Sequence, residues 1–156
     1  MPQHEPYRFQ TRIRFIDTDA SGRIHYTAMF RYFESAEIEF LRELGFKYGD
    51  SGYGFPRVHV ECDFRLALVH DDLIEIEVSL AQLGRSSFRF EFRTWKSGEL
   101  AASGAVVIVC MDIRTQKATA LPNSLREKLA SRLLTPLKVG EKGVEDAGPS
   151  GHSRKE

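Results

Sequence analysis

The sequence predicts an α+β fold in which a curved antiparallel sheet wraps around one long central helix. Two observations lead to this prediction. Apolar residues recur with helical spacing over one long segment, residues 26–44, and they alternate with polar residues, as in strands, in several segments on either side of it. The chain has 156 residues, which is the size of one domain with a single core.

The first element expected is a strand over residues 7–16. Phe9, Ile13 and Phe15 lie there among polar neighbours, a pattern typical of a half-buried strand. Residues 17–22 follow with the sequence Asp-Thr-Asp-Ala-Ser-Gly, which is rich in turn formers. We therefore expect the chain to leave the sheet at Asp17.

The second element is the long helix over residues 26–44. One face of this helix carries the apolar residues Met29, Phe33, Ala36, Phe40 and Leu44. Further apolar residues widen this stripe, as expected of a helix enclosed by a curved sheet, and Gly45 is a natural helix end. Glu37 falls inside the apolar sector, either as a carboxylate paired with an arginine at its margin or as a group that faces the substrate.

The remaining elements follow a glycine-rich loop over residues 47–56. Alternating patterns predict four antiparallel strands over residues 58–66, 74–80, 88–93 and 101–111. The first two should each have one dry and one wet face, and the last is nearly all apolar from Ala105, which favours an interior strand. Leu121-Pro122-Asn123-Ser124 then begins a short second helix.

This order of elements corresponds to the hotdog architecture, a sheet curled around one long helix. Residues 1–138 are assigned to this domain, and residues 139–156, rich in Gly, Lys and Glu, are expected to form a disordered tail. The sheet should have exposed edges, and pairing with a second copy commonly covers such an edge. We therefore expect a homodimer or a homotetramer.

Charge and composition exclude several classes of partner. The chain has 22 basic and 22 acidic residues, so no net field favours nucleic acid or an anionic membrane. No apolar run is long enough to enter a membrane and residues 1–6 do not resemble a signal peptide, so a cytoplasmic protein is expected. Cys62 and Cys110 lie in apolar, strand-like runs, which favours buried thiols over a disulfide or a metal site.

The chemistry is expected where the first strand ends. Asp17 and Asp19 lie two residues apart, so their carboxylates should point the same way if the chain stays extended. Two such charges raise the pKa of one carboxylate and can make it a general base. Ordinary turn chemistry is the alternative, and a metal-binding Asp-x-Asp of a nucleotide-sugar transferase would need a second ligand cluster, which the sequence lacks.

The long helix begins a few residues after this pair. Its first N–H groups have no partners within the helix, so they form an anion site. A thioester carbonyl bound to such donors becomes an oxyanion in the transition state, and a nearby carboxylate can attack the carbonyl carbon or deprotonate a water. The combination is suited to acyl transfer.

Several stretches resemble the signature of the 4-hydroxybenzoyl-CoA thioesterase family, and within it the short acyl-CoA thioesterase branch associated with the bacterial Tol-Pal system. The likeness runs through residues 17–26, 30–34, 41–45, 62–72, 84–88, 106–112 and 121–122. The resemblance implies a hotdog-fold acyl-CoA thioesterase. It also implies that Asp19 is the catalytic carboxylate, that the backbone N–H of Tyr26 polarises the thioester carbonyl, and that Asp17 supports the site.

The same resemblance places coenzyme A at residues 84–87. Arg85 is suited to a phosphate by its planar, charged donors, and Ser86 and Ser87 can bond phosphate or pantetheine. A solvated hairpin charge is the alternative interpretation of Arg85.

The chain departs from the family pattern at the start of the helix. The branch has a Tyr-His pair followed by Ala and Asn or Ser, where this chain has His25-Tyr26-Thr27-Ala28, and it has a Tyr in place of Met29. Thr27 is then the only hydroxyl nearby that can orient water. His25 can assist proton transfer or serve as a structural donor.

The expected reaction is hydrolysis of an acyl-CoA to a free acid and coenzyme A, without a metal or any cofactor beyond the substrate's own coenzyme A. Asp19 acts as nucleophile or as general base, with Tyr26 N–H as oxyanion donor. Two alternatives stay open. One is a hotdog dehydratase or hydratase that uses His25 with Glu34 or Asp19, and the other is a module that binds an acyl thioester or a protein without catalysis.

Overall fold

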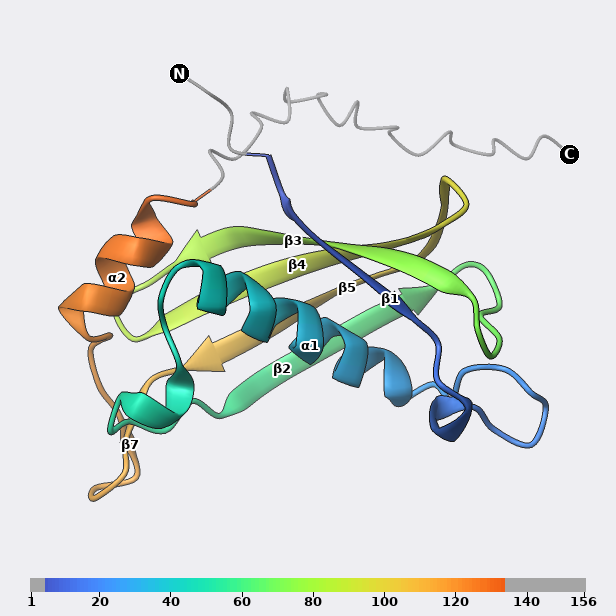
Figure 1. The fold of residues 1–156 in the computed structure, drawn as a ribbon. Coiled ribbons are helices and arrows are strands. Elements are labelled where there is room, and N and C mark those ends of the chain that lie inside the picture. Colours follow the sequence, from blue (N-terminus) through green and yellow to red (C-terminus); the bar gives the residue numbers. More distant parts are fainter. Residues whose placement is uncertain (1–4, 134–156) are drawn as a thin grey trace, which may run out of the picture.

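The computed structural model describes residues 5–133 and contains every element expected in that range (Figure 1). In chain order the elements are β1 (Tyr7–Arg12), the 3₁₀ turn η1 (Phe15–Asp17), α1 (Ala28–Glu43), the 3₁₀ turn η2 (Tyr48–Asp50), β2 (Arg57–Phe64), β3 (Leu73–Leu83), β4 (Ser87–Lys96), β5 (Glu99–Val109), β6 (Met111–Asp112), β7 (Lys117–Ala118) and α2 (Asn123–Ala130). The small β6–β7 hairpin was not predicted. The proposed boundary at residue 138 and the tail after it lie outside the described residues.

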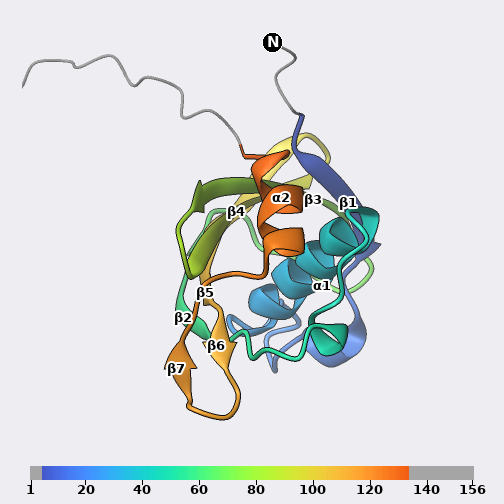
Figure 2. The same ribbon diagram turned by 90° about the vertical axis from the view of Figure 1, so that its left-hand side faces the viewer.

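The five long strands form one antiparallel sheet in the order β1-β3-β4-β5-β2. β5 lies between β4 and β2, which confirms that the most apolar strand is interior. The sheet curls around α1, which lies on its concave face, while α2 packs beyond the end of β3 (Figure 2). This arrangement confirms the predicted α+β hotdog architecture.

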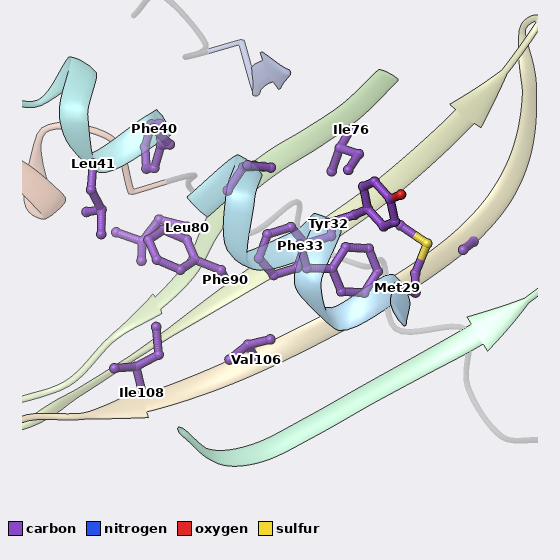
Figure 3. Close-up of a cluster of buried hydrophobic side chains, with 14 of the residues drawn as sticks. Met29, Tyr32, Phe33, Phe40, Leu41, Ile76, Leu80, Phe90, Val106 and Ile108 are labelled. Carbon is purple, nitrogen blue, oxygen red and sulfur yellow. The ribbon is translucent and has the colours of Figure 1, made fainter. Parts of the chain in front are cut away.

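The core fills the space between α1 and the concave face of the sheet (Figure 3). Phe33 of α1 stacks on Phe92 of β4 with ring centroids 4.5 Å apart. Gly104 of β5 permits this close approach. A Cβ at position 104 would lie 2.6 Å from the Phe33 ring and 2.4 Å from the carbonyl oxygen of Glu61, closer than side chains can pack.

α1 ends where the sequence predicts. Gly45 has a φ of +76°, and the N–H of Phe46 donates to the carbonyl of Leu41 at 2.9 Å, so the last turn closes as glycine-terminated helices do. The helix begins at Ala28, two residues later than expected, because Tyr26 and Thr27 belong to the loop that precedes it.

The first strand differs from its prediction. β1 ends at Arg12, and the chain then turns through η1 instead of continuing as a strand to residue 16. Phe15, predicted on the apolar face of that strand, is 75% exposed, whereas Asp17 is buried. The turn therefore places the charged side chain of Asp17 in the interior and the apolar side chain of Phe15 on the surface. Asp17 can be buried because hydrogen-bond donors surround its carboxylate, as described below.

β2 also differs from its prediction of one dry face. Val60 pairs with Val106 and Phe64 with Ala102 across the ladder, so both side chains lie on the helix-facing side of the sheet. They are nevertheless 47% and 48% exposed, whereas the helix-facing residues of β3 and β4 are buried. α1 therefore leaves the inner face of the edge strand β2 uncovered.

The two cysteines are free thiols. Cys110 is buried and Cys62 partly buried, and burial, with the charge of Asp63, raises the pKa of the Cys62 thiol to about 11. Neither thiol is therefore set up as a reactive thiolate at neutral pH. Among residues 5–133, no helix has the length and apolar character needed to span a bilayer.

Candidate active site

Asp19 lies on a tight turn between η1 and α1. The N–H of Asp19 donates to the carbonyl of Arg23 at 2.8 Å, and the N–H of Gly22 donates to the carbonyl of Asp19 at 3.0 Å. Gly22 has a φ of +79°, a conformation that residues with a Cβ rarely adopt. The turn therefore fixes the backbone of Asp19 while its side chain stays exposed.

The carboxylate of Asp19 is held on one side only. Its Oδ1 accepts hydrogen bonds from the backbone N–H of Ser21 at 2.7 Å and from the Ser21 hydroxyl at 2.5 Å. These bonds, with smaller contributions from the Arg23 backbone and the charge of His25, lower the pKa of Asp19 below its ordinary value. Its Oδ2 receives no hydrogen bond from residues 5–133, so the carboxylate is ionised at neutral pH with one oxygen free.

Ser21 is a part of the site that the sequence analysis did not single out. The signal was present, because an Asp followed two residues later by a Ser commonly forms a side-chain turn of this kind.

The start of α1 presents a free donor beside this turn. The N–H of Ala28 donates to the carbonyl of His25 at 2.8 Å, and the N–H of Thr27 donates to Nδ1 of His25 at 3.2 Å. The N–H of Tyr26, by contrast, donates to no acceptor within the described part of the chain. This N–H lies just before the positive end of the helix, where a developing negative charge is stabilised.

His25 and Thr27 are bound to each other. Nδ1 of His25 lies 2.7 Å from the Thr27 hydroxyl, and the His25 ring stacks on the ring of Tyr26 with centroids 4.6 Å apart. These contacts hold the imidazole against the helix start, which agrees with a structural role for His25.

Asp17 does not share the environment of Asp19. It is 2% exposed and points towards α1, where Oδ1 accepts bonds from Arg31 and Oδ2 accepts bonds from Tyr32 and Arg14. Burial alone would raise the pKa of Asp17, but these hydrogen bonds outweigh it and lower the pKa below its ordinary value.

The expected pair of parallel carboxylates, one with a raised pKa, is therefore wrong. η1 interrupts the extended chain between Arg12 and the turn, so the alternation that would align Asp17 with Asp19 is lost. Each carboxylate has its own donors, and the pKa of each is lowered.

Glu37 is paired with an arginine, which is one of the two interpretations that the sequence left open. It is 1% exposed, forms an ion pair with Arg57, and accepts a hydrogen bond from the Tyr48 hydroxyl at 3.2 Å. Burial raises the pKa of Glu37 to about 7, although Arg57 and Tyr48 act against the increase.

Within one chain, the structure does not bring the predicted coenzyme A residues near Asp19. β3 begins opposite the end of β1, since Leu73 pairs with Arg12. It then extends for about 33 Å before it reaches the loop with Arg85, at a rise of about 3.3 Å for each residue. Arg85 is bound through its carbonyl to Leu121 and Arg126 beside α2, at the opposite end of the sheet (Figure 1). Ser86 and Ser87 lie in the same hairpin.

A metal site was not expected, and within residues 5–133 no three or more His, Cys, Asp or Glu side chains are grouped closely enough to hold a metal ion.

Comparison with known proteins gives a consistent result over most of the chain. Residues 13–129 match the family model described as the thioesterase-like superfamily. A 1,4-dihydroxy-2-naphthoyl-CoA hydrolase of Synechococcus elongatus is 30% identical over 128 residues, covering 79% of this chain and 94% of that protein. The long-chain acyl-CoA thioesterase FadM of Escherichia coli is 31% identical, covering 73% of this chain and 96% of that protein. Among solved structures, a gentisyl-coenzyme A thioesterase superposes with a TM-score of 0.72 at 31% identity, covering 78% of this chain and 98% of the other.

Proposed function

The chain belongs to the thioesterase-like superfamily, and on that basis we propose that Asp19 is the carboxylate with which it hydrolyses acyl-CoA thioesters. The chain is a thioester hydrolase that converts acyl-CoA and water into a free carboxylic acid and coenzyme A, in keeping with the hydrolase and thioesterase names of its relatives. The observation that carries the role of Asp19 is the presence, on one short loop, of an ionised carboxylate with a free oxygen and an unpaired backbone donor.

Asp19 can act by either of two routes. In the first, its free oxygen bonds to the thioester carbon, the carbon–sulfur bond breaks, and coenzyme A leaves as a thiolate that takes a proton from water. Water then hydrolyses the acyl–aspartate anhydride to the acid and the free carboxylate. In the second, Asp19 takes a proton from a water whose oxygen attacks the same carbon; the carbon–sulfur bond then breaks, and the proton passes from Asp19 to the leaving coenzyme A thiolate, which leaves the free acid, coenzyme A and the ionised Asp19. The lowered pKa of Asp19 supports both routes, since each begins with the ionised form.

The N–H of Tyr26 is proposed as the oxyanion donor in both routes. Charge develops on the thioester oxygen in the transition state, and a donor that has no other partner is available to it without breaking an existing bond. His25 and Thr27 lie beside this donor and hold each other, which supports a role in shaping the helix start. No metal and no cofactor takes part in this proposal.

The dehydratase or hydratase alternative has less support. Such a reaction needs an acid and a base on either side of the acyl chain, and the expected set was His25 with Glu34 or Asp19, of which Asp19 lies on the same short loop as His25. In the structure Glu34 is exposed with the guanidinium of Arg57 3.9 Å away, whereas His25 is bonded to Thr27.

We further propose that a second copy of the chain completes the site. Val58, Val60 and Phe64 expose a strip of apolar surface on the edge strand β2, which a paired strand would cover. An antiparallel pairing of two β2 strands would place the Phe64 end of one chain beside the Arg57 end of the other. Asp19 lies at the Phe64 end of its own sheet and Arg85 at the Arg57 end, so the pairing would bring the partner's hairpin towards Asp19.

This arrangement supports the assignment of Arg85, Ser86 and Ser87 to coenzyme A binding, in a homodimer or in a homotetramer built from such dimers. It also gives a way in which residues at opposite ends of β3, a strand about 33 Å long, can serve one substrate. The cytoplasmic location, the 4-hydroxybenzoyl-CoA branch and the association with the Tol-Pal system stay predictions of the sequence.

The direct test is release of free thiol from a panel of aliphatic and aromatic acyl-CoAs, followed with a thiol reagent. The full chain should release coenzyme A from at least one class, whereas Asp19→Asn should not. Asp50→Asn, an exposed carboxylate at the far end of α1, is the matched control and should keep wild-type activity. Binding of acyl-CoA with no thiol release from any of the panel would favour the non-catalytic module instead.

A further inference from the structure

Residues 18–27 form the loop that carries the Asp19 carboxylate and the Tyr26 N–H. A hydrogen bond between main-chain atoms closes this loop at Asp17. The N–H of His25, next to Tyr26, donates to the carbonyl oxygen of Asp17 at 2.8 Å. Asp19 lies two residues after Asp17, inside the closed segment. The backbone of Asp17 therefore lies beside both ends of the loop that holds the carboxylate and the oxyanion donor.

The side chain of Asp17 connects the same point to α1. Arg31 donates to Oδ1 through Nε at 3.1 Å and Nη2 at 2.5 Å, and the hydroxyl of Tyr32 donates to Oδ2 at 2.7 Å. The Tyr32 oxygen in turn accepts the N–H of Arg14 at 2.9 Å. A buried carboxylate is costly unless donors compensate for its lost hydration, and here both oxygens have donors from the helix.

Two arginines contact Asp17, and they differ in what they connect. Arg14 precedes Asp17 by three residues in the same segment, and its side chain is 67% exposed. Its side chain neutralises the carboxylate without connecting it to another element, and its backbone N–H, which donates to Tyr32, is kept when the side chain is removed. Arg31 and Tyr32 lie on α1, fourteen and fifteen residues after Asp17, so only their bonds join the η1 turn to the helix.

We propose that Arg31 and Tyr32 are positioning residues, which act through Asp17 to hold the Asp19 carboxylate in a fixed relation to the Tyr26 N–H. This inference rests on the proposed function of the site. The position of Asp19 follows from η1 and the turn after it, whereas that of Tyr26 follows from the start of α1. The bonds from Arg31 and Tyr32 to Asp17 set the relation between the two, and a misplacement of about 1 Å in such a site can cost about 100-fold in rate.

The test compares Arg31→Ala with Arg14→Ala in the full chain. Each variant removes one guanidinium from the same carboxylate, but only Arg31→Ala breaks the connection to α1. For Arg31→Ala, kcat should fall between about 10- and 100-fold while KM stays within about twofold, and Arg14→Ala should retain kcat. Added guanidinium ion should restore part of the activity of Arg31→Ala.

Three results would overturn the proposal. An equal loss of kcat in both variants would mean that Arg31 only neutralises charge. Unchanged kcat in Arg31→Ala would mean that the connection is not needed. A rise of KM with unaltered kcat would mean that Arg31, whose side chain is 54% exposed, contacts the substrate.

Hydrogen exchange of the backbone amides of residues 18–27 provides a measurement that does not depend on turnover. Exchange should accelerate in Arg31→Ala and stay at the wild-type rate in Arg14→Ala. If the wild type released no thiol, the proposed function would fail, while this comparison would still support or refute the connection. Should Arg31→Ala not fold, Tyr32→Phe, which removes one hydroxyl and no charge, gives the same two readouts.

Discussion

Asp17 and Glu37 are both carboxylates buried against α1, yet their pKa values are shifted in opposite directions. The pKa of Asp17 is lowered, because hydrogen bonds from Tyr32, Arg31 and Arg14 to both of its oxygens outweigh burial. For Glu37 deep burial dominates and raises the pKa to about 7, although Arg57 and Tyr48 donate to its Oε2 and act against the increase. Depth of burial and hydrogen-bond donors together decide the charge state of these two carboxylates, because Glu37 has more protein around it than Asp17, whose partners Arg14 and Arg31 are more than half exposed.

The comparison separates a structural carboxylate from a reactive one. Asp17 has all its acceptor oxygens occupied and is shielded from solvent, so it has no free oxygen for chemistry. Asp19 is ionised as well, but it is exposed and one of its oxygens is free. A lowered pKa therefore does not identify a catalytic group until its hydrogen bonds are counted.

The largest stability effect is expected for Asp17→Ala. Removal of a buried ion-pair partner leaves the donors of Arg31 and Tyr32 without an acceptor, and such a change typically destabilises a protein by about 3–5 kcal/mol. The free energy of unfolding, measured in urea at pH 7, should fall by that order. A loss below about 1 kcal/mol would contradict the assignment of Asp17 as the buried connection between η1 and α1.

Glu37→Gln should change the pH dependence of stability. The folded pKa of about 7 lies above the ordinary value of 4.5, so the contribution of Glu37 is fully present below pH 4.5 and is lost as the pH rises to about 7. The shift corresponds to roughly 3 kcal/mol. The wild type should therefore lose stability between pH 4.5 and 7 relative to Glu37→Gln.

Asp17 gives the opposite slope, which makes the two residues controls for each other. Its folded pKa lies below 3.8, so its stabilisation is present above that pH and is lost as the pH falls through the folded pKa. Urea unfolding from pH 2.5 to 7.5 should show the Asp17 contribution disappearing at the acid end in both the wild type and Glu37→Gln. If the free energy of unfolding changed with pH in the same way in the wild type and in Glu37→Gln over the whole range, the pKa of Glu37 would not be raised by folding.

A smaller effect is expected at Arg85, whose charge has no ion-pair partner among residues 5–133. A phosphate contact far from the reacting carbon binds ground state and transition state alike, so Arg85→Ala should raise KM for acyl-CoA about tenfold with little change in kcat. The control substrate is an acyl-pantetheine without the nucleotide, which should be hydrolysed equally by both proteins. An equal loss with this substrate would indicate that Arg85 supports the hairpin instead.

Local patterns in the sequence were sufficient for the order of the two helices and the five long strands. Alternation predicted β3, β4 and β5, and Gly45 marked the end of α1, because both signals arise within a few residues. The exposure of β2 could not be predicted in that way. Its apolar face depends on what covers an edge strand, and alternation alone does not contain that information.

The site was predictable in part. The sequence pattern indicated a pair of carboxylates before a helix start, and only the family resemblance singled out Asp19 from that pair; the Asp-x-Ser spacing could also have indicated Ser21. The direction of Asp17 could not be predicted, because it depends on a 3₁₀ turn and on two donors from α1, far along the sequence. The separation of Arg85 from Asp19 follows only from the topology of the sheet.

The central claim is that Asp19 reacts while Asp17 positions it, and the kcat of Asp19→Asn measured beside that of Asp17→Asn tests this most directly. Asparagine keeps the shape of each side chain and removes its charge. For Asp19→Asn, kcat should fall by about 10²- to 10⁴-fold with substrate binding intact, since a positioned base or nucleophile is lost. Asp17→Asn should lose less, because the amide oxygen still accepts from Arg31 and the amide NH2 can donate to the Tyr32 hydroxyl oxygen. Near-wild-type kcat in a folded Asp19→Asn, beside an inactive Asp17→Asn, would contradict the account.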